Sequence, residues 1–262
     1  MPVCGAVLLP NSPLLLPGLK DQVKQAVAKT RQAITDLAVE LLARQPDMLF
    51  LISSVTPTTI LSVQQWSLWQ APLSRLDFSA FGDLLTNLTS RGAVGFTHRL
   101  KEKLETKFNL PLVTGLSLPY TAGVPLVNLV SLGIDLPVVY LQVPSNIEVG
   151  QFKVLGEELG DFLQTSPERI ILVAAGELGL TTGYRAAEGK LFNQQFVGLA
   201  QAADWGSLFN LPLSLRQDSG QTVWSPAMLV YSILKNSPLI LVGKVYEAPL
   251  GVGWLTAEFN FS

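Results

Sequence analysis

Four short apolar runs that alternate with longer amphipathic stretches constrain this chain more than any other feature. Between the first two runs, residues 20–44 carry apolar side chains at intervals of three and four, which is typical of an amphipathic helix, and the pattern stops before Pro46. Strands that are apolar throughout are typical of parallel sheets covered by helices on both faces. The sequence therefore predicts an α/β fold with a mixed, mostly parallel central sheet. The four runs cover 3–9, 48–53, 137–143 and 169–174.

The rest of the chain fills out this sheet and ends in a hairpin. Residues 55–78 are irregular and are expected to hold short strands. Two apolar runs, 239–246 and 252–259, predict a C-terminal antiparallel hairpin at the sheet edge. No internal repeat or linker appears, so we expect residues 1–262 to form a single domain. Further elements are expected as a strand over 111–116 and helices over 80–90, 97–107, 124–132, 148–165, 191–203 and 225–235.

Composition limits the classes of partner. Of 262 residues, 48% are hydrophobic and 15% charged, which favours a heavily buried sheet and a surface covered in a homodimer or other homo-oligomer. The net charge is −2 and no basic run exists, so a nucleic-acid partner is not expected.

The chain also lacks the signals of secretion and of membrane insertion. Its N-terminus has no positively charged region, and prolines interrupt the first apolar stretch. The uncharged stretches 55–74 and 113–134 contain prolines and polar residues, so neither is expected to span a membrane. The single cysteine, Cys4, excludes an internal disulfide and is expected to be a buried core thiol. We therefore expect a cytoplasmic protein.

Four segments, in a defined order, carry a family resemblance. They are Leu9-Pro-Asn-Ser-Pro-Leu-Leu-Leu-Pro17, Leu51-Ile-Ser-Ser-Val55, a stretch from Leu118-Pro-Tyr-Thr-Ala-Gly-Val-Pro-Leu126 to Ala174-Ala-Gly-Glu-Leu178, and Tyr246-Glu-Ala-Pro-Leu-Gly-Val-Gly-Trp254. Together they resemble the class III extradiol ring-cleavage dioxygenase catalytic-subunit superfamily, which includes the Memo-like proteins. The resemblance implies that superfamily's α/β fold. In its enzymes, two histidines and a glutamate hold ferrous iron, and another histidine transfers protons.

The resemblance assigns five positions to the site. Asn11 and Val55 stand where the two metal-binding histidines would be, and Tyr120 stands where the acid–base histidine would be. Glu177 takes the place of a motif aspartate, and Glu247 matches the glutamate ligand.

The sequence contains too few histidines to form the iron site. The only histidine, His98, lies outside every matching motif, and Leu180 replaces the histidine that ends the motif around Glu177. Ferrous iron that activates dioxygen is held by two imidazoles and a carboxylate. The oxygen donors of Asn11, Glu177 and Glu247 would suit Mg²⁺ or Ca²⁺ only weakly. We therefore expect no metal and no cofactor, and we expect His98 to be a surface residue.

Other catalytic groups are equally poorly supported. Tyr120 has an unperturbed pKa of about 10, and no lysine or arginine lies near it in sequence, so we interpret it as an aromatic that fills the vacated pocket. Ser53 and Ser54 lack a glycine-flanked nucleophile elbow.

Three functional hypotheses follow. The favoured one is a non-catalytic module that binds a small molecule or a protein in the former active-site cleft. The second is an enzyme of metal-independent chemistry, in which Tyr120, Glu177 and Glu247 converge and at least one pKa is strongly perturbed. The third, a conventional extradiol dioxygenase, is contradicted by the histidine count.

Overall fold

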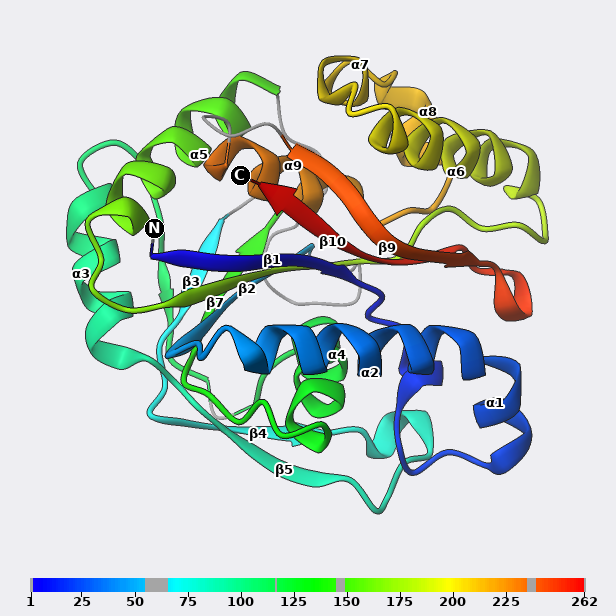
Figure 1. The fold of residues 1–262 in the computed structure, drawn as a ribbon, viewed down its shortest axis with the longest axis horizontal. Coiled ribbons are helices and arrows are strands. Elements are labelled where there is room, and N and C mark those ends of the chain that lie inside the picture. The colour runs from blue at the N-terminus through cyan, green and yellow to red at the C-terminus, as the bar shows by residue number, and fades with distance from the viewer. Residues whose placement is uncertain (1, 55–65, 116, 145–148, 235–238, 262) are drawn as a thin grey trace.

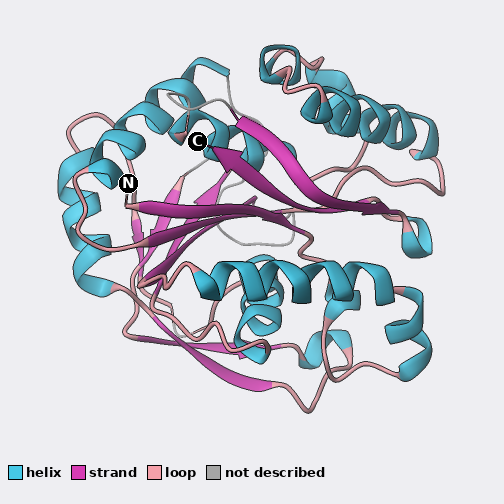
Figure 2. Cartoon of the chain, viewed as in Figure 1, coloured by secondary structure: helices cyan, strands magenta, loops and turns pink. Residues whose placement is uncertain are grey.

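An eight-stranded sheet runs through the molecule, with helices on both faces (Figures 1 and 2). The computed structural model describes residues 2–54, 66–115, 117–144, 149–234 and 239–261. Within these residues the strand order is β6-β3-β7-β2-β8-β1-β10-β9. The strands are β1 (Val3–Leu9), β2 (Met48–Ser54), β3 (Ser67–Trp69), β6 (Leu112–Val113), β7 (Val138–Val143), β8 (Ile170–Ala175), β9 (Leu239–Glu247) and β10 (Trp254–Phe261).

The centre of the sheet is parallel, as predicted. Strands β7, β2, β8 and β1 pair in parallel, whereas β3 is antiparallel to β7 and β10 is antiparallel to β1. Every residue of β2, β7 and β8 is buried, which explains why these strands are apolar over most of their length. The predicted C-terminal hairpin is also confirmed: β9 and β10 pair antiparallel, and β9 forms one edge of the sheet.

Successive side chains of each strand enter different cores. In β2, Phe50 and Ile52 belong to one core, and Leu49 and Leu51 to the other. The first core packs under α3, α5, α6, α7, α8 and α9, and the second under α2 and α4. The helices are α1 (Asp21–Ala26), α2 (Ala28–Ala43), α3 (Val94–Leu104), α4 (Tyr120–Ser131), α5 (Val149–Gln164), α6 (Ala186–Gln201), α7 (Trp205–Phe209), α8 (Leu213–Asp218) and α9 (Trp224–Ile233).

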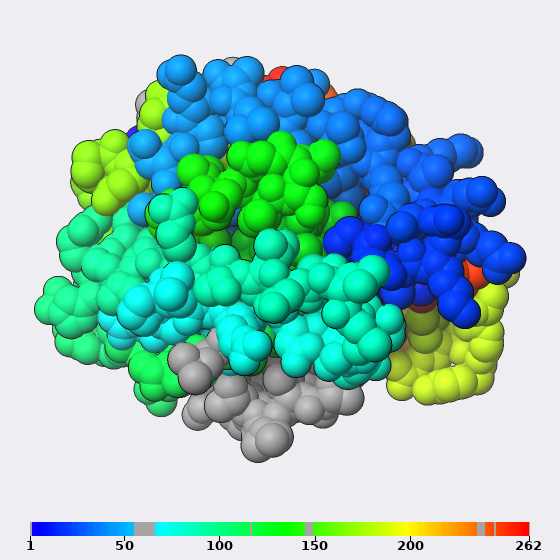
Figure 3. All heavy atoms as spheres, turned by 90° about the horizontal axis from the view of Figure 1, so that it is seen from below, coloured from blue at the N-terminus to red at the C-terminus, as the bar shows by residue number. Residues whose placement is uncertain are grey.

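A second, two-stranded sheet corrects one prediction. The helix expected over 80–90 is wrong, because the chain there forms a 3₁₀ turn, Ser79–Phe81, and then β5 (Asn87–Arg91), which pairs with β4 (Leu73–Asp77). In this ladder Leu88 lies opposite Leu76, which is buried in the α2–α4 core, so long-range pairing overrides local helical preference. Figure 3 shows the β4–β5 region lying across this face of the molecule beside α4.

Several helix boundaries also differ from expectation. The single helix expected over 20–44 is interrupted at Val27, a fully buried residue with non-helical φ and ψ of −115° and 16°. The helix expected over 124–132 begins at Tyr120, and the one expected over 191–203 begins at Ala186. The short helices α7 and α8 were not predicted.

Cys4 is half-buried, and its thiol lies 3.5 Å from the carbonyl oxygen of Ile170.

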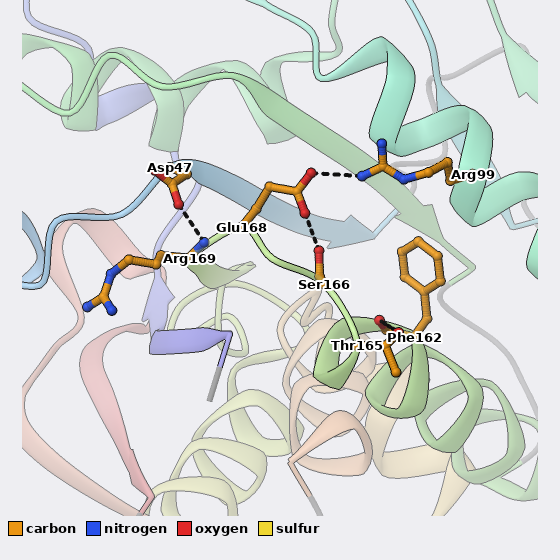
Figure 4. Close-up of polar contacts among 7 residues, drawn as sticks. All are labelled: Asp47, Arg99, Phe162, Thr165, Ser166, Glu168 and Arg169. Carbon is orange, nitrogen blue, oxygen red and sulfur yellow. Dashed lines mark hydrogen bonds and ion pairs between the residues drawn. The ribbon is translucent and has the colours of Figure 1, made fainter.

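The amino edge of the parallel strands is fastened by paired polar groups (Figure 4). The backbone N–H of Arg169 donates to a carboxylate oxygen of Asp47 at 2.7 Å, and the guanidinium of Arg169 donates to the carbonyl of Arg44. Arg99 donates to Glu168 at 2.7 Å. These contacts tie the connections before β2 and β8 together.

No helix within the described ranges is long and apolar enough to cross a bilayer.

Candidate functional site

The polar residues that follow the parallel strands gather at the opposite, carboxyl edge of the sheet. In open α/β sheets, ligands bind outside the carboxyl ends of the strands. Gln142 and Ser53 are register partners near the ends of β7 and β2, and Ala175 ends β8 opposite both Ser53 and Leu9. Two residues further along the chain, Asn11 follows β1 and Glu177 follows β8.

The spacing between these residues suits one small molecule. Neighbouring strands lie about 4.8 Å apart and each residue advances about 3.3 Å, so the Cα atoms of Gln142 and Glu177 are separated by about 12 Å. Gln142 shares a strand face with Tyr140, which belongs to the core under α2 and α4. Trp254, which neighbours Glu177, belongs to the same core. Both polar side chains therefore border the same side of the sheet.

Two buried amides at this edge have polar atoms without partners among the described residues. Only 2% of Asn11 and 1% of Gln142 is exposed. Within the described residues, neither Nδ2 of Asn11 nor either polar atom of the Gln142 amide has a hydrogen-bond partner. The same is true of the hydroxyl of Ser67, the residue opposite Gln142 in β3. A buried polar group without a partner costs about 1–3 kcal/mol, so such groups are rare unless water or a ligand completes them.

Glu177 sits on a rigid backbone among groups that perturb its acidity. Its N–H donates to Thr222 Oγ1 at 2.9 Å, and its carbonyl accepts the N–H groups of Thr222 and Val223. Burial raises the pKa of the Glu177 carboxyl above its usual range, and the nearby Ser12 hydroxyl and Trp254 indole oppose the rise. The indole Nε1 is close to the carboxyl but makes no hydrogen bond of normal geometry. Glu177 therefore holds its proton to a higher pH than an exposed glutamate.

A fully paired cluster lies beside the unpaired amides. The Ser53 hydroxyl contacts Thr121 Oγ1 at 3.1 Å and the Tyr140 hydroxyl at 2.9 Å. Burial raises the pKa of Tyr140 to about 12, and the hydrogen bonds from Ser53 and Thr121 only partly oppose it. Tyr140 therefore stays neutral at physiological pH and cannot act as a base there. The sequence signal for this cluster is a tyrosine and a glutamine two residues apart, Tyr140 and Gln142, inside an apolar run.

The remaining expected site residues are placed differently. Tyr120 is the first residue of α4, and its ring packs edge-on against Phe81 with centroids 4.9 Å apart. Glu247 Oε1 accepts the N–H of Thr30 at 3.1 Å and its hydroxyl at 2.9 Å, so this carboxylate ties the hairpin to α2. Val55 lies outside the described residues.

Trp254 lies next to both Glu177 and Glu247. It is the cross-strand neighbour of Glu247 in the hairpin and also lies beside the Glu177 carboxyl. The two carboxylates nevertheless have separate polar neighbours, Ser12 for Glu177 and Thr30 for Glu247.

These residues do not fit ferrous iron. No group of three or more histidine, cysteine, aspartate or glutamate side chains within the described ranges is arranged to hold a metal ion. His98 lies on α3, where its side chain is 61% exposed and Nε2 is 3.4 Å from Glu102, in agreement with the predicted surface position. The one matched carboxylate, Glu247, already accepts two hydrogen bonds from Thr30.

Comparisons with known proteins add the fold and nothing further. No protein-family model matches this chain, and no curated protein matches it. Among solved structures, it is similar to the crystal structure of the uncharacterized protein JW3007 from Escherichia coli K12, with 13% sequence identity and a TM-score of 0.63. The similarity covers 98% of this chain and 100% of that one. The fold is shared. At this identity, the likeness says nothing of substrate or chemistry.

Proposed function

We propose that this protein binds a small polar molecule at the carboxyl edge of its sheet and does so without iron. The observation that carries the proposal is that, within the described residues, Nδ2 of the buried Asn11 and both polar atoms of the Gln142 amide lack partners beside the perturbed carboxyl of Glu177. At the amino edge of the same sheet, by contrast, Asp47 and Arg169 are paired through hydrogen bonds.

The side chains define the class of ligand. Gln142 offers two donor hydrogens and an acceptor oxygen, Asn11 offers donors, and Glu177 offers a carboxyl group. No positively charged side chain is among these groups. The ligand best matched to them is an uncharged molecule with several hydroxyl or amide groups.

We further propose that the chain is a member of the class III extradiol dioxygenase superfamily whose metal site has been lost. The four matching segments support this, because Asn11, Tyr120 and Glu177 follow or begin elements at one end of the sheet. The single His98 supports the loss of iron chemistry. A cytoplasmic location, which we also propose, is supported by the single cysteine.

A second candidate function rests on Glu177. Burial raises the pKa of its carboxyl, as a general acid requires, so metal-independent proton transfer at the same edge of the sheet is the second candidate. The two candidates differ in outcome: under the first, a bound molecule is released unchanged, whereas under the second it is converted.

Native mass spectrometry of the protein purified from cells tests the binding proposal. We expect a non-covalently bound molecule that is lost in Gln142→Met. The matched control is Asn128→Leu, because the buried Asn128 amide already donates to the carbonyl of Val124 at 2.8 Å and lies within α4. A bound molecule retained equally by both variants, or absent from every preparation and from screened polyols and amides, would contradict the proposal.

The identity of a protein partner is a separate matter. We propose a homodimer, which is supported by the position of β9 at the sheet edge and by Ile240 in that strand, whose side chain is 49% exposed.

A further inference from the structure

A buried arginine lies on the other side of the sheet. Arg216 is in α8, only 8% of the residue is exposed, and its guanidinium carbon lies 3.9 Å from the centroid of the Trp224 ring. Within the described part of the chain, Nε and Nη1 of Arg216 are buried and have no hydrogen-bond acceptor. Trp224 belongs to the core under α5 and α9, so this guanidinium is on the opposite side of the sheet from Gln142.

The polar groups around Arg216 are already paired with one another. The Gln221 amide donates to the Arg216 carbonyl at 3.2 Å and accepts the Trp224 N–H at 2.8 Å. The Ser219 hydroxyl donates to the same Arg216 carbonyl, and the Trp224 indole donates to the carbonyl of Leu208 at 2.8 Å. Among the described residues, Nε and Nη1 of the Arg216 guanidinium are left without acceptors beside these paired groups.

Other partly buried arginines show what a structural guanidinium looks like in this protein. Arg31 donates through Nη2 to the carbonyls of Leu15 and Leu16 at 2.8 and 2.9 Å, although its Nε has no partner among the described residues, and Arg44 pairs with the carboxylate of Glu258. No carboxylate forms an ion pair with Arg216 among the described residues.

An unpaired buried guanidinium is costly and cannot avoid its charge. Arginine does not lose its proton in proteins, so burial leaves a full positive charge that needs an acceptor. Burial lowers the pKa of Arg216, but this does not remove the charge at neutral pH. Stacking on Trp224 offsets part of the cost through cation–π attraction, but within the described residues Nε and Nη1 still have no acceptor.

We propose that Arg216 is the recognition residue of an anion site, where it binds a carboxylate or phosphate group against the Trp224 ring. The planar guanidinium can donate hydrogen bonds to two oxygens of such a group, and the adjacent indole favours a ligand that also has a flat or apolar portion. The site lies across the sheet from Asn11 and Gln142, so it stands or falls independently of the proposed function.

Thermal unfolding at constant ionic strength tests this site. The probes are inorganic phosphate, acetate and benzoate, with chloride as the balancing anion. We expect phosphate or a carboxylate to raise the melting temperature of the wild type in a saturable way. The rise in melting temperature should disappear in Arg216→Met. In Arg216→Lys the apparent affinity for the anion should fall at least tenfold, because lysine keeps the charge but cannot donate two parallel hydrogen bonds to one anionic group.

A charge-matched control separates specific binding from general screening. Lys153 is an exposed cation of the same aromatic cluster, 5.5 Å from the Phe209 ring, so Lys153→Met removes the same charge nearby and should leave the response intact. A response to phosphate and not to the carboxylates would indicate a phosphorylated ligand. A response to acetate or benzoate and not to phosphate would indicate an organic acid. A response shared by wild type and Arg216→Met, or no response to any probe, overturns the proposal.

A second measurement needs no variant. Wild-type crystals soaked in selenate should show an anomalous peak within hydrogen-bond distance of the Arg216 guanidinium. A structure in which those N–H groups contact only ordered water after soaking, together with no thermal response, would reduce Arg216 to a stacking residue.

Discussion

Replacing Gln142 with methionine should make the ligand-free protein more stable. The Gln142 side chain is 1% exposed, and both its Nε2 and its Oε1 lack partners in the described residues. Methionine has a similar length and no polar group that needs a partner, so the substitution removes a desolvation cost of about 1–3 kcal/mol. For a chain of this size each kcal/mol shifts the melting temperature by about 2–4 °C, so a rise of about 2–12 °C is expected.

The assay is calorimetric or urea unfolding of dialysed protein, with Asn128→Leu as the matched control. Asn128 is a buried amide whose hydrogen bond to the Val124 carbonyl is made, so its replacement should cost about 1 kcal/mol. Opposite signs for the two variants are the expected result. If Gln142→Met loses as much stability as Asn128→Leu, then the Gln142 amide is paired in solution and the reasoning about this edge is refuted.

Three further predictions test other parts of the account. Burial raises the pKa of the Glu177 carboxyl, so the contribution of this group to the free energy of unfolding is present below its pKa in the unfolded chain and is lost as pH rises through its pKa in the folded chain. Glu177→Gln should therefore flatten that part of the curve of stability against pH. An unchanged curve would contradict the raised pKa. Thr30→Val should cost about 1 kcal/mol in urea unfolding, because it removes the hydroxyl that donates to Glu247, and no loss would mean that this tie is weak. Ile240→Lys should shift a dimer to monomer in sizing with light scattering; a wild-type monomer would contradict the dimer itself.

The sheet could be predicted because its strands are buried on both faces. Runs such as 48–53 and 169–174 are apolar at every position but one at an end, and they became β2 and β8 with boundaries within one residue. The helix predicted over 80–90 failed because its residues are specified by long-range pairing, with Leu88 opposite Leu76. Helix starts such as Ala186 were missed because no side chain caps them.

Two residues of the candidate site, Asn11 and Glu177, come from the family resemblance, and each lies two residues beyond a strand that the sequence predicts. Gln142 was overlooked because it lies within an apolar run, where a single polar residue was read as part of the strand. The role of Glu247 could not be read from sequence at all, because it depends on contact with Thr30, 217 residues away.

A high-resolution crystal structure of the protein as purified from cells is the most direct test of the central claim. We predict a bound polar molecule whose atoms lie within hydrogen-bond distance of both the Asn11 and the Gln142 amides. A structure in which protein side chains satisfy both amides, or in which an iron ion is held between residue 11 and Glu247, would contradict it.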